Sequence, residues 1–154
     1  MKTFINWIIS LFKPTKNIAS VPYYNLDTQF PIAAEIAFRI EMIHSINEYR
    51  EKLKLSTLNH QNNFSKVATQ HSQDMAAKQK AGHFNFIERV NMFPEYFISE
   101  IIGYNYRSTT GYLDAFIKSE KHHEILINPK FTHIGIGYAL DDNEKQYVTI
   151  IFGK

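Results

Sequence analysis

The stretch IGIGYALDDNEKQYVTIIF, residues 134–152, decides the fold class of this chain. Its first half alternates large apolar residues with smaller ones, at Ile134, Ile136, Tyr138 and Leu140. Residues 147–152 are rich in β-branched and aromatic side chains, and the polar residues 141–145 separate the two segments. Alternation with a period of two is typical of a β-strand, and a short polar segment between two such strands is typical of a turn. The stretch therefore predicts an antiparallel β-hairpin.

Upstream of the hairpin, apolar residues recur with a helical period instead. This pattern predicts helices over residues 32–53, 64–80 and 110–120. Two neighbouring stripes on the first of them are expected to be buried, namely Ile36, Ile40 and Ile43 beside Met42, Ile46, Tyr49 and Leu53. Helices followed by a hairpin, without a repeated βαβ unit, predict an α+β fold with helices packed on an antiparallel sheet.

Length and composition exclude several classes of protein. A chain of 154 residues has the size of one ordinary domain. The net charge of +2, from 17 basic and 15 acidic residues, is too small for a nucleic-acid-binding surface, so no nucleic-acid partner is expected. The chain has no cysteine, which excludes disulfides, thiolate metal sites and a cysteine nucleophile. Any metal must therefore be held by histidine and carboxylate.

Residues 1–20 differ in character from the rest of the chain. The apolar run FINWIISLF, residues 4–12, is shorter than the roughly 20 residues that cross a bilayer. A basic start followed by a short apolar run is typical of a secretory signal. The same segment also fits a retained anchor that contacts the membrane interface through residues 1–13. A helix packed on the domain is the third interpretation.

The three prolines Pro14, Pro22 and Pro31 predict an extended linker over residues 21–31, before a domain over residues 32–154. Residues 1–20 hold three lysines and no acidic residue, so their removal leaves 14 basic and 15 acidic residues, a net charge of 14 − 15 = −1. The basic excess of the chain therefore belongs to its N-terminal segment, as expected of a segment directed to a membrane.

Histidine and glutamate are the candidates for chemistry, because phosphate-loop, nucleophile-elbow and zincin motifs are absent from the sequence. His83 follows Gly82 in irregular chain after the second helix, where a side chain can face a cleft. Glu100 lies in the apolar segment 96–104 and must find a partner or stay at the surface. His71 lies on the apolar face of its helix, which favours a packed or hydrogen-bonded structural role. Spacing alone does not show whether His83, Glu100 and His122 converge.

Six short patterns occur together in a fixed order: Asn47-Glu48-Tyr49-Arg50, the segment 67–76 around His71, Gly82-His83, Ser99-Glu100, Ser119-Glu120-Lys121-His122 with Ile127-Asn128-Pro129, and Ile134-Gly135-Ile136-Gly137-Tyr138. This set resembles the CAP superfamily, also called SCP-like, which covers cysteine-rich secretory proteins, antigen 5 and pathogenesis-related class 1 proteins. The resemblance spans about residues 36–153 and is nearest to the short bacterial branch without disulfides.

The resemblance implies a three-layer α-β-α sandwich with a central antiparallel sheet and a cleft lined by two histidines and one or two glutamates. His83 and His122 match the two histidines and Glu100 matches one glutamate. Ser119 stands where many relatives have the second glutamate, and Glu120 is adjacent. The expected ligand-binding cleft therefore consists of His83, Glu100, His122, Ser119 and Glu120.

Two imidazoles and one carboxylate form a ligand set that suits Zn²⁺ or another divalent cation, although the fold is not expected to need one. A metal site of His83, His122 and Glu100 competes with an internal hydrogen-bonded network of the same residues. The resemblance implies a secreted or cell-envelope binding protein, monomeric, for a small ligand or lipid. The alternative is a metal-assisted hydrolase of peptides or esters, with the same three residues as catalytic candidates.

Overall fold

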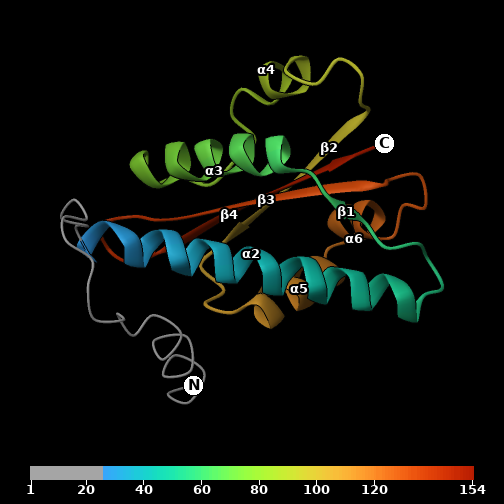
Figure 1. The fold of residues 1–154 in the computed structure, drawn as a ribbon, viewed down its shortest axis with the longest axis horizontal. Helices are drawn as coiled ribbons and strands as arrows, with labels where there is room; N and C mark the ends of the chain where they lie inside the picture. Colours follow the sequence, from blue (N-terminus) through green and yellow to red (C-terminus); the bar gives the residue numbers. More distant parts are fainter. Residues whose placement is uncertain (1–25) are drawn as a thin grey trace, which may run out of the picture. The chain divides into compact units, whose positions relative to one another are not determined.

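In residues 26–154, which the computed structural model describes, a four-stranded sheet carries helices on both faces (Figure 1). Residues 31–154 form one compact unit. The helices are α2 (Leu26–Lys52), α3 (Asn62–Ala77), α4 (Phe86–Asn91), α5 (Thr109–Lys118) and α6 (Glu120–Leu126). The strands are β1 (Asn59–His60), β2 (Ile98–Tyr104), β3 (His133–Leu140) and β4 (Gln146–Gly153).

The strand order in the sheet is β1-β3-β4-β2. The predicted hairpin is confirmed as β3 and β4, which pair antiparallel with Ile136 opposite Ile150. Strand β2 pairs antiparallel with the other side of β4 and sets Glu100 opposite Ile151. Only the short β1 departs from the antiparallel arrangement, because it runs parallel to β3. Glu100 therefore belongs to a strand at the edge of the sheet.

The helices form two layers around this sheet, which confirms the α+β sandwich (Figure 1). Helix α3 packs on β3 and β4, and α4 lies on the same side through its contacts with the first turn of α3. Helices α5 and α6 cover the opposite face together with residues 31–52 of α2. Strand β2 consequently turns Ile101 toward one layer, and Ile98 and Glu100 toward the other.

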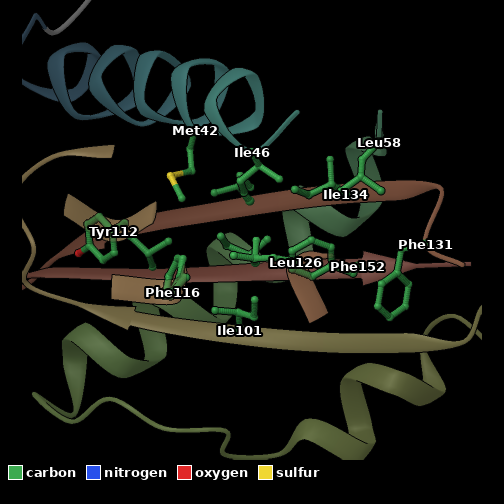
Figure 2. Close-up of a cluster of buried hydrophobic side chains, with 13 residues drawn as sticks. Met42, Ile46, Leu58, Ile101, Tyr112, Phe116, Leu126, Phe131, Ile134 and Phe152 are labelled. Atoms are coloured by element: carbon green, nitrogen blue, oxygen red, sulfur yellow. The ribbon is translucent and has the colours of Figure 1, made fainter. Parts of the chain in front are cut away.

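The larger hydrophobic core lies between the sheet and the layer of α2, α5 and α6 (Figure 2). Its buried side chains are Met42, Ile46, Leu58, Ile101, Tyr112, Phe116, Leu126, Phe131, Ile134, Ile136, Val148, Ile150 and Phe152. A smaller cluster on the other face joins Phe64 and Ala68 of α3 to Phe93, Ile98 and Ile151. Most of the apolar burial, and the stabilisation that follows from it, therefore lies on one side of the sheet.

The glycines in the IGIGY pattern let α3 lie directly on β3. A Cβ atom added at Gly137 would stand 2.1 Å from the backbone of Ala68 and Thr69, and one at Gly135 would stand 2.3 Å from Phe64. Such distances are far below van der Waals contact, so the helix backbone occupies the space that a side chain would need. The pattern thus specifies the close approach of helix and strand.

Helix α2 differs from the prediction in its start and in its buried face. It begins at Leu26, earlier than the predicted residue 32. Met42 and Ile46 are fully buried as predicted, but Ile36, Ile40 and Leu53 are 46%, 65% and 45% exposed, so the prediction that these three are buried was wrong. The stripe with Met42 and Ile46 faces the sheet, and of the other stripe Ile43 packs against the same core.

The Asn47-x-x-Arg50 pattern has a structural role. The Asn47 side chain accepts from the Leu58 amide at 2.8 Å and donates to the Leu58 carbonyl at 3.1 Å. The Arg50 guanidinium is fully buried and donates to the carbonyls of Ser56 at 2.9 Å and Leu126 at 2.7 Å. These bonds fix the loop after α2 and the end of α6.

Four elements were not predicted: β1, α4, β2 and α6. The sequence marked residues 96–104 only as an apolar segment, and α4 is shorter than the two or more turns that a periodic pattern needs. The predictions for residues 1–20 and for residues 21–25 of the linker lie outside the described residues. The prediction of an extended linker was wrong for residues 26–31, which form the start of α2. Among residues 26–154, no helix is long and apolar enough to cross a bilayer.

Candidate functional site

A buried carboxylate, Glu100, is the centre of the candidate site. Its side chain is 1% exposed, and it projects from β2 toward the layer of α3 and α4. Arg89 of α4 holds it with two parallel bonds, from Nε to Oε2 and from Nη2 to Oε1, both at 2.7 Å. A bidentate pair of this kind is among the strongest polar contacts in proteins, and it compensates the charge that burial would otherwise leave isolated.

The short helix α4 and the residues just before it position Arg89. Asn85, just before the helix, adopts a left-handed conformation with φ 54°, which turns the chain into α4. Asparagine tolerates this region better than most residues do. The third nitrogen of Arg89, Nη1, donates to the carbonyl of Phe84 in the same loop. The guanidinium therefore ties the loop after α3 to the edge of the sheet.

His83 lies in that loop and contacts the same carboxylate. Its Nδ1 is 2.9 Å from Glu100 Oε1, while the His83 side chain is 52% exposed. An ionised carboxylate only accepts hydrogen bonds, so Nδ1 is the nitrogen that carries the proton. The other nitrogen, Nε2, is then an acceptor with a fixed ring orientation. This is the arrangement in which a carboxylate orients a histidine that binds a metal or ligand.

His71 of α3 lies beneath the pair and is itself buried, 3% exposed. Its Nε2 is 2.9 Å from the Gly82 carbonyl and 4.0 Å from Glu100 Oε1. Burial, followed by the charge of Arg89, lowers the pKa of His71, and the charge of Glu100 only partly opposes this. His71 is therefore neutral at pH 7 and donates to Gly82. The predicted packed, hydrogen-bonded role of His71 is confirmed.

The ionisation of Glu100 is decided by competing effects. Burial by itself raises the pKa of this carboxyl, but hydrogen bonds from His83 and Arg89, together with the charge of Arg89, outweigh burial and lower it overall. Glu100 is thus a carboxylate at neutral pH, and both of its oxygens are already engaged by protein donors.

His122 approaches from the opposite layer, on α6, which also contacts β2. Its ring lies edge-on to Phe116 with the ring centroids 5.5 Å apart. Burial and then the charge of His83 lower the pKa of His122. Among the described residues, no hydrogen bond links His122 to His83 or Glu100.

The structure places the remaining predicted residues apart from Glu100. Ser119 joins α5 to α6 and lines a separate hollow with Tyr106, Asp114 and Lys118. Glu120 is exposed in the first turn of α6. Neither side chain is hydrogen-bonded to His83, Glu100 or His122 within residues 26–154. The site that the structure assembles is therefore His83 with Glu100, and with His122 nearby.

The side chains at the site determine which residues could bind a metal ion. In the part of the chain that the structure describes, no three His, Cys, Asp or Glu residues are grouped so that they could hold one. Arg89 and His83 already donate three hydrogen bonds to the buried carboxylate of Glu100, which favours a role in orienting His83 over direct coordination. The free Nε2 of His83 fits a ligand role, with Glu100 as the group that orients it.

Sequence reasoning missed Arg89, which is the principal partner of Glu100. Arg89 precedes Glu100 by 11 positions and lies on a helix that was not predicted. The signal that was available is physical. A glutamate inside an apolar strand needs a buried cation, and Arg89 is the only lysine or arginine in residues 81–106.

The fold, the histidine–glutamate pair and the order of the short patterns define a class of protein. Residues 43–152 match the Cysteine-rich secretory protein family, CAP, and the chain belongs to this family. The uncharacterized protein YkwD of Bacillus subtilis is 29% identical over 132 residues, which are 81% of this chain and 51% of that protein. The chain thus spans about half the length of this relative.

Two solved structures are similar in fold. An outer surface protein from Borrelia burgdorferi has a TM-score of 0.68 at 23% identity, over 73% of this chain and 89% of that one. An extracellular SCP-domain protein from Bacillus anthracis has a TM-score of 0.72 at 20% identity, over 88% of this chain and 45% of that one. At these identities the comparison establishes the fold.

Proposed function

We propose that this protein is an exported binding protein whose CAP domain holds a divalent cation or a small ligand at the edge of β2, through His83 and His122. Two observations outside the site support export. The similar structures are described as an outer surface protein and an extracellular protein, and residues 1–20 have the character of a leader.

The observation that carries the proposal is the His83–Glu100 contact at 2.9 Å. Glu100 is fixed by Arg89 and buried, whereas the His83 ring is half exposed. A buried anion that fixes the orientation of an accessible imidazole leaves Nε2 free to accept a hydrogen bond from a ligand or to bind a cation. A network needed only for stability does not require one member to face solvent.

For a cation, His83 and His122 are the proposed ligands, and Glu100 acts through His83. A bound divalent ion would supply a Lewis-acid centre with positions open to water or to another ligand. Two protein ligands give weaker binding than the three or four of most zinc sites, so we expect exchangeable metal that is not needed for folding. Because only neutral imidazole binds metal, affinity falls as pH falls.

Titration calorimetry with Zn²⁺ at pH 7 tests this proposal. We expect His83→Ala and His122→Ala each to weaken binding by at least tenfold. His44→Ala is the matched control, because its side chain is 72% exposed on α2 and should leave binding unchanged. Equal affinity of wild type and His83→Ala would reject the site.

The alternative function is a metal-assisted hydrolase. Turnover in a screen of peptides and esters that is lost with chelator and in His83→Ala would favour the hydrolase over a binding protein. Export is tested separately, by mass spectrometry of the protein from its host. A start near residue 20 supports a cleaved signal, and an intact Met1 in the envelope fraction supports an anchor.

A further inference from the structure

A second hollow, of about 270 Å³, opens between α3 and α4 on the outer side of the polar network. Helix α3 contributes Val67, His71 and Asp74 to its lining, and the segment of α4 contributes Asn85, Arg89 and Met92. The hollow is close to the lower end of the volumes of small-molecule sites. The proposed cation ligands, His83 and His122, do not line it.

Two buried polar side chains, His71 and Arg89, reach this hollow although they are only 3% and 6% exposed. His71 donates through Nε2 to the Gly82 carbonyl, so its Nδ1 must be an unprotonated acceptor. Within residues 26–154, no donor reaches Nδ1, and this atom is not among the fully enclosed polar atoms without a partner. His71 therefore offers one unused acceptor to the hollow.

The electrostatics at the base of the hollow favour an uncharged occupant. The charge of Arg89 is compensated by Glu100 at 2.7 Å, and burial lowers the pKa of His71 and keeps the ring neutral. Three further charged residues, Lys66, Asp74 and Glu88, line the hollow at exposed positions, where solvent and salt screen their charges. An ion that reached the base of the hollow would lose hydration without meeting an opposite unpaired charge there.

From this geometry we propose that the hollow binds a small neutral alcohol. The apolar body lies against Val67 and Met92, and the hydroxyl donates to His71 Nδ1. The volume fits a molecule with a single ring or a short chain. A hydrogen bond to an otherwise unsatisfied acceptor makes a modest net contribution, so the hydroxyl should account for roughly threefold to tenfold in affinity.

The test is a titration of the full chain with benzyl alcohol at pH 7, followed by the ¹⁵N resonances of the histidine rings. We expect a saturable shift of His71 Nδ1, with Kd in the millimolar range. Benzyl methyl ether, which cannot donate, should bind at least threefold more weakly. Benzylamine and benzoate have the same ring with a charged substituent, and the shift of His71 Nδ1 should not saturate with either of them at the same concentrations.

Two matched variants locate the binding. Met92→Trp fills the hollow and should weaken binding of benzyl alcohol by at least tenfold. Ile87→Trp adds the same ring to the same segment at a similarly exposed position that does not line the hollow, and should leave Kd unchanged. A shift that never saturates, an ether that binds as tightly as the alcohol, or a Kd unchanged by Met92→Trp would each overturn the proposal.

Discussion

The two faces of the sheet are built from the same strands but bury different chemistry. Toward α2, α5 and α6 the sheet presents a continuous apolar core (Figure 2). Toward α3 and α4 it presents a smaller apolar cluster beside His71, Arg89 and Glu100. Along β2, the consecutive residues Glu100 and Ile101 point to opposite faces of the sheet, Glu100 to the polar face and Ile101 to the apolar core. The face toward α2, α5 and α6 thus supplies most of the stability, which offsets the cost of burying charged groups on the face toward α3 and α4.

The largest expected effect is on the apolar face. Phe152→Ala removes a fully buried ring from the main core and should lower the free energy of unfolding by about 3–5 kcal/mol. Urea denaturation measures this loss. Ile87→Ala, at a position 67% exposed, is the control and should change stability by less than about 0.5 kcal/mol. A small loss in Phe152→Ala would mean that this core is not the main source of stability.

On the polar face, Arg89→Met keeps most of the side-chain volume but leaves Glu100 buried without its cation. We expect a loss of about 3 kcal/mol at pH 7, again from urea denaturation. The double variant Arg89→Met/Glu100→Gln removes both charges and should recover part of that loss. If the single and double variants were equally unstable, packing rather than charge pairing would explain the role of Arg89.

A smaller effect is expected where α3 meets the sheet. Gly137→Ala places a methyl group into the backbone of α3 and should destabilise the protein by about 1–3 kcal/mol, because the helix must move away. The displacement should also disturb His71 and be visible in its ring resonances. Wild-type stability of Gly137→Ala would contradict the close helix–strand contact.

The smallest effect is the dependence on pH. Burial and Arg89 lower the pKa of His71 in the folded state, against the opposing charges of Glu100 and Asp74. The unfolded chain therefore takes up a proton below pH ~6.5 that the folded chain does not, and stability falls as pH falls through this range. For one proton the slope is at most about 1.4 kcal/mol per pH unit.

Urea midpoints of wild type and His71→Gln between pH 7.5 and pH 5 measure this contribution. We expect a shallower loss of stability in His71→Gln, because glutamine does not titrate. Parallel curves for the two proteins would show that another group causes the acid sensitivity.

The fold was more predictable than the site, for a physical reason. Alternation in residues 134–152 and the helical period around Met42 and Ile46 are local signals, and these predicted the hairpin and the buried face of α2. Local periodicity could not separate the exposed Ile36 from its buried neighbours, because that depends on how the helix is rotated against the sheet.

Within the site, His83 contacts Glu100 although the two are separated by 17 positions, and only the resemblance gave a reason to consider them together. The ion pair between Arg89 and Glu100 could not be predicted, because the sequence does not show which basic residue contacts a buried carboxylate. Ser119 and Glu120 are adjacent to His122 in sequence, but the turn between α5 and α6 directs them elsewhere. Proximity along a chain was therefore a poor guide to proximity in the cleft.

The order of strands has a consequence for synthesis on the ribosome. In the part of the chain that the structure describes, β2 pairs only with β4, although α5, α6 and β3 intervene between them. A nascent chain that has emerged only as far as β3 therefore holds Glu100 on a strand without a partner. β2 can pair only after residues 146–153 of β4 have been synthesised. Until then β2, which carries Glu100, is an unpaired strand that a chaperone can bind.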